Sequence, residues 1–460
     1  MICIWFEAIK AENDSEKKQK MLDDLNGLMR NFQENYLMTA RDFAQWGAYE
    51  DAVLVLKQCT KKYPMLYYYA AYYEEKMGED EAAKKSLEKA ESCAFDYCFP
   101  NKLDDIAVLT FAIEKWLQKR KAPYYLGNLF YDKLQWKKSV ELWEMSEKAD
   151  DTFSIVHRNL ALAYYNKMGD SKAAKRELEK AFSLNRKDAR IFLELDQLYK
   201  KLGYSFKERL AKYDEDPSLA ESRDDLYIEY ITLMNMCGEY ERAYRCIMGR
   251  RFHPWEGGEG KITTQYTISL LEMAKQCLAS EKYEQAEKLL KKALVYPENL
   301  GEGKLEGTKD NHLFYHLGLA LEAQGKHDEA KTCFETATIG TDEPAGAMYY
   351  NDQPADMILY QGLAFEKLGK TREAKSRFYR LIDYGEQHLN DEGKIEYFAV
   401  SLPDFLIFDE DYTKKNRAHC CYLMALGNIG LQNREKAAEF LNEALEIEPS
   451  HMMATLYQKQ

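Results

Sequence analysis

Residues 311–344 read NHLFYHLGLALEAQGKHDEAKTCFETATIGTDEP, and this stretch decides the fold. Its small and large apolar residues follow the spacing of two short helices joined by a turn: Gly318, Leu321, Gly325, Ala330, Phe334, Ala337 and Pro344. Apolar residues three or four apart share one helix face. A glycine at the end of the first helix supplies the turn. The stretch therefore predicts a helix–turn–helix unit of about 34 residues.

The same phrase returns along the chain. Residues 355–385 carry Gly362, Phe365, Gly369, Ala374 and Phe378, and the segment near the start carries Ala40, Phe43, Gly47, Ala52, Leu56, Cys59 and Pro64. Weaker copies occupy 127–143, 169–181, 199–203, 238–247, 274–297 and 425–449. This is the pattern of the tetratricopeptide repeat (TPR), and about ten units tile the chain. We predict an all-α fold, a right-handed TPR superhelix (α-solenoid) of about ten helix–turn–helix repeats that runs over residues 1–460.

Each repeated position has a physical reason. A small residue in the first helix lets the second helix approach closely, and a large apolar residue in the second helix fills the groove. A proline ends the second helix because it cannot continue the hydrogen-bond ladder. One such pair cannot bury its own apolar face, so neighbouring pairs must stack.

The period lengthens in the second half of the chain. Ala243, Ala286, Ala330 and Ala374 are 43, 44 and 44 residues apart, and the additional residues have loop composition at 252–260, 299–307 and 340–354. We therefore divide the solenoid into N-terminal repeats (33–96), central repeats (97–248), repeats with inserted loops (249–384) and an irregular segment with a C-terminal repeat and capping helix (385–460). Equivalent insertions emerge on one edge of a solenoid and would form a composite surface. Alternatively, they only adjust the superhelical twist.

Charge and composition restrict the partners. The formal net charge is −13, and short basic runs such as 17–20 have acids nearby, so nucleic acids and anionic membranes are not expected to bind. No stretch approaches the roughly 20 apolar residues of a membrane span. Ten cysteines without a CxxC pair favour free thiols and a reducing compartment, so we expect a cytoplasmic protein.

The 252–260 loop, FHPWEGGEG, is the sharpest local feature. Pro254 stiffens it and its glycines permit close backbone approach. His253, Trp255, Glu256 and Glu259 are candidate ligand-binding residues, because an indole stacks on a sugar and carboxylates accept its hydroxyl hydrogens. Glu256 and Glu259 also suit an acid/base pair, but a glycine-rich loop is a poor frame for two carboxylates. A purely structural loop that caps adjacent units is the other interpretation.

A second set of candidates lies on first helices, whose faces line the groove of a TPR array. Asparagine amides can hold the backbone of an extended partner, and charged residues add selectivity. The candidates are Asn128, Asp132, Arg158, Asn159, Asn166, Arg190 and Arg223. The alternative is that the asparagines bond only to neighbouring repeats.

Catalytic and metal motifs are absent from the sequence. It has no Walker loop, GxGxxG, GxSxG or Cys/His nucleophile setting, so we expect neither catalysis nor a cofactor. His312 and His316 stand four apart on one predicted helix. We favour a partly buried structural role for this pair over metal binding.

Several phrases resemble more than a generic repeat: YCFPNKLDDI at 97–106, YLGNLFYD at 125–132, HRNLALAYYN at 157–166, RDDL at 223–226 and the 252–260 loop. Together they are similar to the C-terminal TPR region of large bacterial proteins that carry a domain of unknown function ahead of the repeats. That resemblance implies a β-sandwich-like region upstream and a link to carbohydrate metabolism. No such β region is seen in this sequence, which suggests a truncated relative or a fragment.

Two functions follow as expectations. The first is a non-catalytic scaffold that binds a protein or peptide through the concave groove and the inserted-loop edge. The second is an accessory repeat module of a carbohydrate-active protein, with the 252–260 loop contributing to a sugar site. A self-associating assembly unit is a third possibility, because a truncated solenoid exposes an uncapped apolar end.

Overall fold

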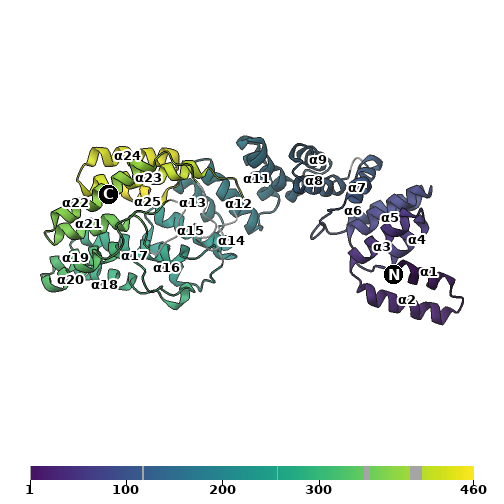
Figure 1. Ribbon diagram of the computed structural model, residues 1–460, viewed down its shortest axis with the longest axis horizontal. Helices are drawn as coiled ribbons and strands as arrows, with labels where there is room; N and C mark the ends of the chain where they lie inside the picture. Colours follow the sequence, from purple (N-terminus) through teal and green to yellow (C-terminus); the bar gives the residue numbers. More distant parts are fainter. Residues whose placement is uncertain (1, 117–118, 256, 347–352, 394–406, 460) are drawn as a thin grey trace. The chain divides into compact units, whose positions relative to one another are not determined.

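The computed structural model describes residues 2–116, 119–255, 257–346, 353–393 and 407–459, and every regular element within these ranges is a helix (Figure 1). Contacts divide the chain into two units, Met1–Asn185 and Arg186–Gln460. The division falls within the predicted central repeats.

The α-helices of the first unit are α1 (Ile2–Ala11), α2 (Ser15–Met29), α3 (Gln33–Gln45), α4 (Tyr49–Gln58), α5 (Pro64–Lys76), α6 (Asp80–Ser92), α7 (Leu103–Lys115), α8 (Lys121–Asp132), α9 (Trp136–Ala149), α10 (Ser154–Ala163) and α11 (Ser171–Leu184). A π-helical turn, Tyr164–Met168, continues α10. Those of the second unit are α12 (Ala189–Lys201), α13 (Phe206–Asp214), α14 (Pro217–Glu221), α15 (Asp224–Met236), α16 (Tyr240–Met248), α17 (Lys261–Ala279), α18 (Tyr283–Ala293), α19 (Asn311–Ala323), α20 (His327–Ala337), α21 (Met357–Lys367), α22 (Thr371–His388), α23 (Tyr412–Gly430), α24 (Arg434–Ile447) and α25 (Met452–Gln458), with a short 3₁₀ turn at Glu298–Leu300.

Consecutive helices form packed pairs. After α2 the described residues contain ten of them: α3/α4, α5/α6, α8/α9, α10/α11, α12/α13, α15/α16, α17/α18, α19/α20, α21/α22 and α23/α24. The predicted all-α fold of about ten helix–turn–helix units is confirmed. Two helices precede the first predicted repeat, and their residues Phe6, Ile9, Leu25 and Met29 are buried in the core of the first unit.

The turn between paired helices needs a left-handed residue. Gly325 (φ +76°) and Gly369 (φ +73°) supply it after α19 and α21, as the repeat pattern predicted. Where the sequence lacks this glycine the turn is retained by other residues, Leu134 (φ 59°), Glu281 (φ 57°) and Gln432 (φ 60°). The weaker copies therefore keep the same geometry at the conformational cost of a non-glycine residue in this region.

A small residue facing an aromatic ring sets the separation of the paired helices. A Cβ added to Gly362 of α21 would lie 2.2 Å from the ring of Phe378 on α22. The corresponding distance from Gly318 to Phe334 is 2.5 Å, and that from Gly127 to the indole of Trp143 is also 2.5 Å. Because a real Cβ does not fit at these distances, the close helix approach inferred from the sequence is confirmed.

Two helix boundaries differ from the predictions. Pro64 does not end a second helix. Instead α4 ends at Gln58, and Pro64 opens α5, where its missing N–H costs nothing. The expected irregular stretch from Gly385 to Lys415 is helical at both ends, since α22 continues to His388 and α23 begins at Tyr412. Gly385 lies inside α22, and α23 passes so close to it that a Cβ added there would lie 2.4 Å from Met424 Cγ.

The last helix of the second unit, α25, lies against helices from much earlier in that unit. Leu456 packs with Met236 of α15 and Ile268 of α17. The hydroxyl of Tyr457 donates a hydrogen bond to that of Tyr360 on α21, at 2.7 Å. This helix therefore covers part of the first-helix face of its own unit.

The contact between Gly362 and Phe378 generates a test. We expect Gly362→Ala to lower the free energy of unfolding by about 1–3 kcal/mol, because the added methyl overpacks a fully buried ring. The matched control is Gly27→Ala in α2, where nothing lies within 4 Å of the added Cβ. There the substitution should raise stability by roughly 0.5–1 kcal/mol through helix propensity. Urea unfolding of both variants measures the change in the free energy of unfolding. If both substitutions stabilised the chain, the packing argument would be contradicted.

Candidate functional site

A surface hollow with a volume of about 510 Å³ lies where the first inserted loop meets the start of α15. We call it the loop-edge pocket. It is lined by Ser222, Arg223, Asp224, Asp225, Arg250, His253 and Trp255. Three of the residues selected from the sequence, Arg223, His253 and Trp255, therefore meet at one place, although the first stands about thirty residues before the other two.

Asp224, the first residue of α15, anchors the loop. Its Oδ2 accepts a hydrogen bond from the backbone N–H of His253 at 2.8 Å, and its Oδ1 accepts one from Arg250. The guanidinium of Arg250 also donates to the carbonyl of Glu221 at 3.1 Å and lies over the ring of Tyr227, 4.6 Å from its centroid. These hydrogen bonds attach the first inserted loop to the start of α15.

The second inserted loop supports the first from the other side. The N–H of Phe252 donates to the carbonyl of Asn299 at 2.8 Å, and the Asn299 side chain donates to the carbonyls of Ile247 (2.8 Å) and Arg250 (3.0 Å). Gly301 has φ +74°, and a Cβ there would lie 2.5 Å from the carbonyl oxygen of Phe252. These two inserted loops lie side by side, as expected of insertions on one edge. Residues 347–352 of the third loop lie outside the described residues.

Trp255 packs against the backbone of its own loop at Gly258. A Cβ added to Gly258 would lie 2.2 Å from the indole, so only glycine lets the backbone pass this close to the ring. The ring is half-buried and lines the pocket. Glu259 is exposed and accepts a hydrogen bond from the Gly257 N–H at 2.7 Å, and it does not line the pocket. Glu256 lies outside the described residues, so the acid/base interpretation of the two glutamates has no geometry to support it.

The two carboxylates of the pocket are already engaged. Arg223 donates two hydrogen bonds to Asp225, at 3.0 and 2.6 Å, and the N–H of Leu226 donates to the same carboxylate at 2.8 Å. Burial raises the pKa of Asp225, but the hydrogen bonds and charge of Arg223 outweigh it, and the pKa lies below its ordinary value. Nδ1 of the exposed His253 imidazole also faces Asp224 Oδ2, at 3.3 Å. The guanidinium of Arg223 therefore supplies most of the remaining donor capacity of the lining.

The predicted groove residues of the first unit mostly bond to their neighbours. Asn128 accepts hydrogen bonds from the indole N–H of Trp143 (3.0 Å) and from Asn159 Nδ2 (3.1 Å), which ties α8 to α9 and α10. Arg158 donates to Asn159 Oδ1 at 3.3 Å. Asp132 is exposed and pairs with Lys133 at 2.7 Å.

The remaining two candidates lie apart from the loop-edge pocket. Asn166 is half-buried in the π-helical turn that follows α10. Arg190 belongs to the second unit, on α12, where its Nε donates to Glu194 at 3.0 Å. Neither residue lines the pocket.

The sequence reasoning did not select Asp224 or Arg250, which hold the pocket together. They are 26 residues apart; Asp224 belongs to the RDDL phrase, which was noted only for its family resemblance, and Arg250 belongs to a short basic run, GRRF. The sequence offered one indication: an acidic pair at a predicted helix start precedes a Pro- and Gly-rich loop by about one repeat, a spacing at which stacked repeats can bring two segments together.

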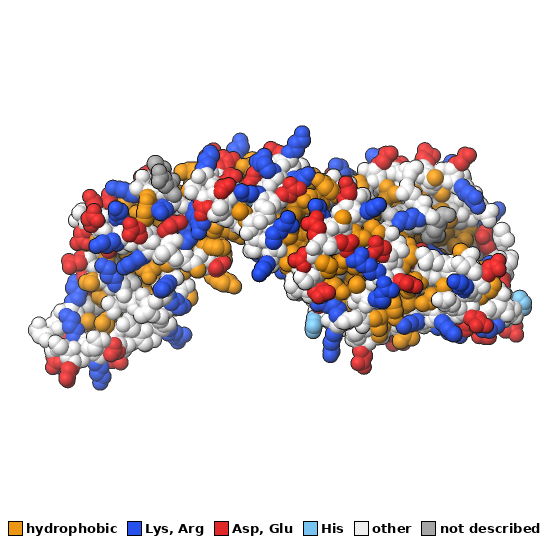
Figure 2. All heavy atoms as spheres, turned by 180° about the vertical axis from the view of Figure 1, so that it is seen from behind, with side chains coloured by type: hydrophobic (Ala, Val, Ile, Leu, Met, Phe, Trp, Pro, Cys, Tyr) orange, Lys and Arg blue, Asp and Glu red, His pale blue; other side chains and the backbone are white. Residues whose placement is uncertain are grey.

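On the face shown in Figure 2, acidic and basic side chains are interspersed.

Comparison with known proteins identifies the repeats. Residues 159–188, 312–338 and 418–451 match one family described as tetratricopeptide repeat, and residues 356–384 match a second family with the same description. The stacked helix pairs define an α-helical repeat protein. The matched segments are tetratricopeptide repeats, and proteins built from such repeats generally mediate protein or peptide binding.

Solved structures of TPR proteins resemble the chain at low identity. YrrB, described as a TPR protein with an unusual peptide-binding site, is 15% identical over 49% of this chain and 97% of its own, with a TM-score of 0.30. A tetratricopeptide repeat protein from Parabacteroides merdae is 18% identical over 63% of this chain and 98% of its own, with a TM-score of 0.26. A thermophilic TPR protein of Thermus thermophilus is 16% identical over 44% and 99%, with a TM-score of 0.26.

Across the described ranges, none of the helices combines the length and the apolar character that crossing a membrane requires.

His312 and His316 have the structural role favoured from the sequence. Nδ1 of His316 donates to the carbonyl of His312 at 2.7 Å, so this nitrogen carries a hydrogen. Burial lowers the pKa of His316 to about 3, and the positive charge of Lys275 adds to the shift. A neighbouring cation and a neutral, buried imidazole suit packing more than metal binding.

This buried imidazole makes the stability of the second unit depend on pH. The folded pKa of His316 lies below the unfolded value of about 6.5, so its contribution is complete above pH 6.5 and is lost as pH falls. The loss is about 1.4 kcal/mol per pH unit for one such group. Between about pH 7 and about pH 5 we expect His316→Gln to lose about 2 kcal/mol less than the parent chain. His327→Gln, at an exposed position of α20, is the control and should lose as much as the parent. Equal losses in both variants, measured by urea unfolding, would show that His316 is not the titrating group.

Proposed function

We propose that the chain is a non-catalytic scaffold that binds a protein or peptide segment, and that the loop-edge pocket is a principal contact. One observation supports this proposal most directly: Arg223, His253 and Trp255 line the same pocket. The loop that carries His253 and Trp255 is also hydrogen-bonded to the second inserted loop. Connecting segments held on a rigid repeat frame are a common place for binding residues. The tetratricopeptide repeats supply that frame.

The chemistry of the pocket indicates what it would accept. Both carboxylates are occupied by Arg223, Arg250 and backbone N–H groups. The remaining donor capacity is that of the Arg223 guanidinium, whose side chain is 42% exposed, and the imidazole of His253, whose side chain is 78% exposed, offers its Nε2. Trp255 adds an apolar aromatic surface. A complementary segment presents a carboxylate beside an aromatic or aliphatic side chain, because Arg pairs strongly with carboxylates.

The first-helix face contributes differently in the two units. In the second unit, α25 covers part of that face through Leu456 and Tyr457, so less of the face is open to a partner there. In the first unit, Asp132 is exposed on the first helix of its repeat and Arg158 is half-buried on the next. We propose that these two charges select among extended partners in the concave groove, while Asn128 and Asn159 fix the spacing of the repeats.

A carbohydrate is the alternative ligand. The pocket places an indole beside Asp224 and Asp225, the combination of groups expected of a sugar site. The resemblance to repeats that follow a domain of unknown function points to the same ligand class. Against it, each of these carboxylates already accepts hydrogen bonds from an arginine and from a backbone N–H.

Selection from a displayed random-peptide library tests the proposal. Peptides with an acidic residue next to an apolar one should be enriched. Their dissociation constants, measured by fluorescence polarisation, should rise roughly tenfold or more with Trp255→Ala and with Arg223→Gln, about 1.4 kcal/mol each. Arg372→Gln, at an exposed position of α22, is the matched control and should leave binding unchanged.

Two outcomes would change the conclusion. The proposal that the loop-edge pocket is the contact would be contradicted if no peptide were enriched, or if the enriched peptides bound both pocket variants as tightly as the parent chain. Saturable binding to a member of an oligosaccharide panel, abolished by Trp255→Ala, would favour the accessory role in a carbohydrate-active protein.

A further inference from the structure

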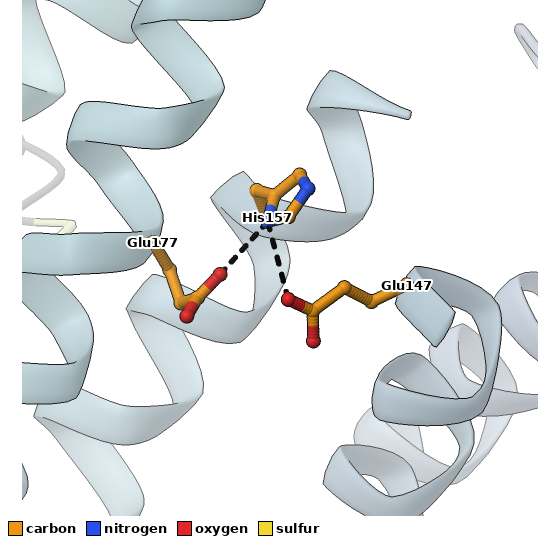
Figure 3. A group of neighbouring side chains, drawn as sticks. All are labelled: Glu147, His157 and Glu177. Carbon is orange, nitrogen blue, oxygen red and sulfur yellow. Dashed lines mark hydrogen bonds and ion pairs between the residues drawn. The ribbon is translucent and has the colours of Figure 1, made fainter. Parts of the chain in front are cut away.

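Three ligand-type side chains meet inside the first unit, from three successive helices. They are Glu147 on α9, His157 on α10 and Glu177 on α11, and Figure 3 shows both carboxylates directed at the same edge of the imidazole. One ligand atom from each residue lies within 4.8 Å of the other two. His157 and Glu177 are buried, whereas Glu147 is 30% exposed.

The orientation of His157 is fixed by its far nitrogen. Nε2 lies 2.8 Å from the carbonyl oxygen of Asp151. A carbonyl only accepts hydrogen bonds, so Nε2 must carry a hydrogen and donate it. Nδ1 then points away from this contact, toward Glu177 Oε2 at 2.8 Å and Glu147 Oε1 at 3.8 Å. Nδ1 therefore carries a hydrogen that it donates to Glu177 Oε2, and it can act as a ligand once that hydrogen has left.

Glu177 is oriented in the same manner. Its Oε1 accepts hydrogen bonds from Arg176, with Nε at 2.9 Å and Nη2 at 2.8 Å, which leaves Oε2 facing the imidazole. An outer hydrogen bond on each inner ligand, from a backbone carbonyl to the histidine and from a donor to the carboxylate, is the arrangement that holds ligands around metal ions.

The spacing suits a small divalent cation. Four-coordinate Zn²⁺ with bonds near 2.0–2.2 Å places its donor atoms about 3.3 Å apart. The observed separations of 2.8 and 3.8 Å from Nδ1 bracket that value. Glu147, the most exposed of the three, can close the remaining distance by a change of side-chain rotamer. Its side also gives water access to the fourth position.

We propose that His157 Nδ1, Glu177 Oε2 and Glu147 Oε1 form a binding site for one Zn²⁺ ion, with water as the fourth ligand. A mixed nitrogen and oxygen set favours Zn²⁺ over Mg²⁺ or Ca²⁺, which prefer oxygen alone. The two carboxylates balance the charge of the ion, and the hydrogen on Nδ1 leaves to solvent when the ion binds. The ion joins α9 of one repeat to α10 and α11 of the next. This inference goes beyond the proposed binding function and is independent of it.

Metal binding by the full chain tests the site. After treatment with a chelator and dialysis, the chain is titrated with Zn²⁺ by calorimetry, and Co²⁺ is substituted to read the ligand field by visible absorption. We expect one high-affinity equivalent per chain and a four-coordinate Co²⁺ spectrum without the charge-transfer bands of thiolate ligands. Glu147→Gln should weaken binding at least tenfold, and His157→Gln should abolish it.

The controls keep a negative result informative. Glu147→Gln leaves the contact between His157 and Glu177 in place, so it should keep the fold, which circular dichroism checks. Glu141→Gln, at an exposed position on the same helix, is matched to it and should bind as the parent does. No uptake by the parent chain, or uptake that both His157→Gln and Glu147→Gln leave unchanged, would overturn the site. The latter result would assign the ion to other groups, such as the ten free cysteines.

Discussion

The close contact between a small residue on one helix and an aromatic ring on the next is the constraint on which the fold depends. A helix pair has little apolar surface of its own, so it is stable only where neighbouring pairs stack at a fixed separation. Phe378 shows the arrangement most clearly, because its fully buried ring lies between Gly362 of its own pair and Gly430 of the following one. Wherever this contact recurs, the phase of the helices and the positions of their connecting loops follow from it.

The interactions that sequence could predict are the local ones. The turn at Gly325 and the pairing of Gly318 with Phe334 lie within one repeat, so a single repeated phrase contains both. Pro64 opens α5 and Gly385 lies within α22, because a proline is accepted in a first helical turn and a glycine within a helix, so residue type alone did not fix the helix boundaries there. The pocket was only half predictable: the loop residues His253 and Trp255 stand out by composition, whereas Asp224 acts through a contact with the following repeat. The cluster around His157 draws on three helices and leaves no motif.

The polar residues divide by location into those that build the array and those left for a partner. Asparagines on first helices, such as Asn128, and buried Asn235, which donates to Gln265 at 3.0 Å, join one repeat to the next. Their amides replace part of the apolar contact between repeats with directional bonds, which fix register as well as distance. On the inserted loops, Asn299 joins one loop to the other, whereas His253 and Trp255 line the loop-edge pocket and stay at least partly exposed.

The position of α25 alters how the second unit can come apart. In an open array each repeat touches only its neighbours, and repeats can fray one at a time from an end. Here Lys459 donates to the carbonyl of Met236, and Lys201 pairs with Glu410, contacts that span 223 and 209 residues. Early and late helices of this unit stabilise each other, so the loss of either exposes apolar surface on both. The second unit therefore behaves as a closed cooperative block, and it must order a long stretch of chain before these contacts can form.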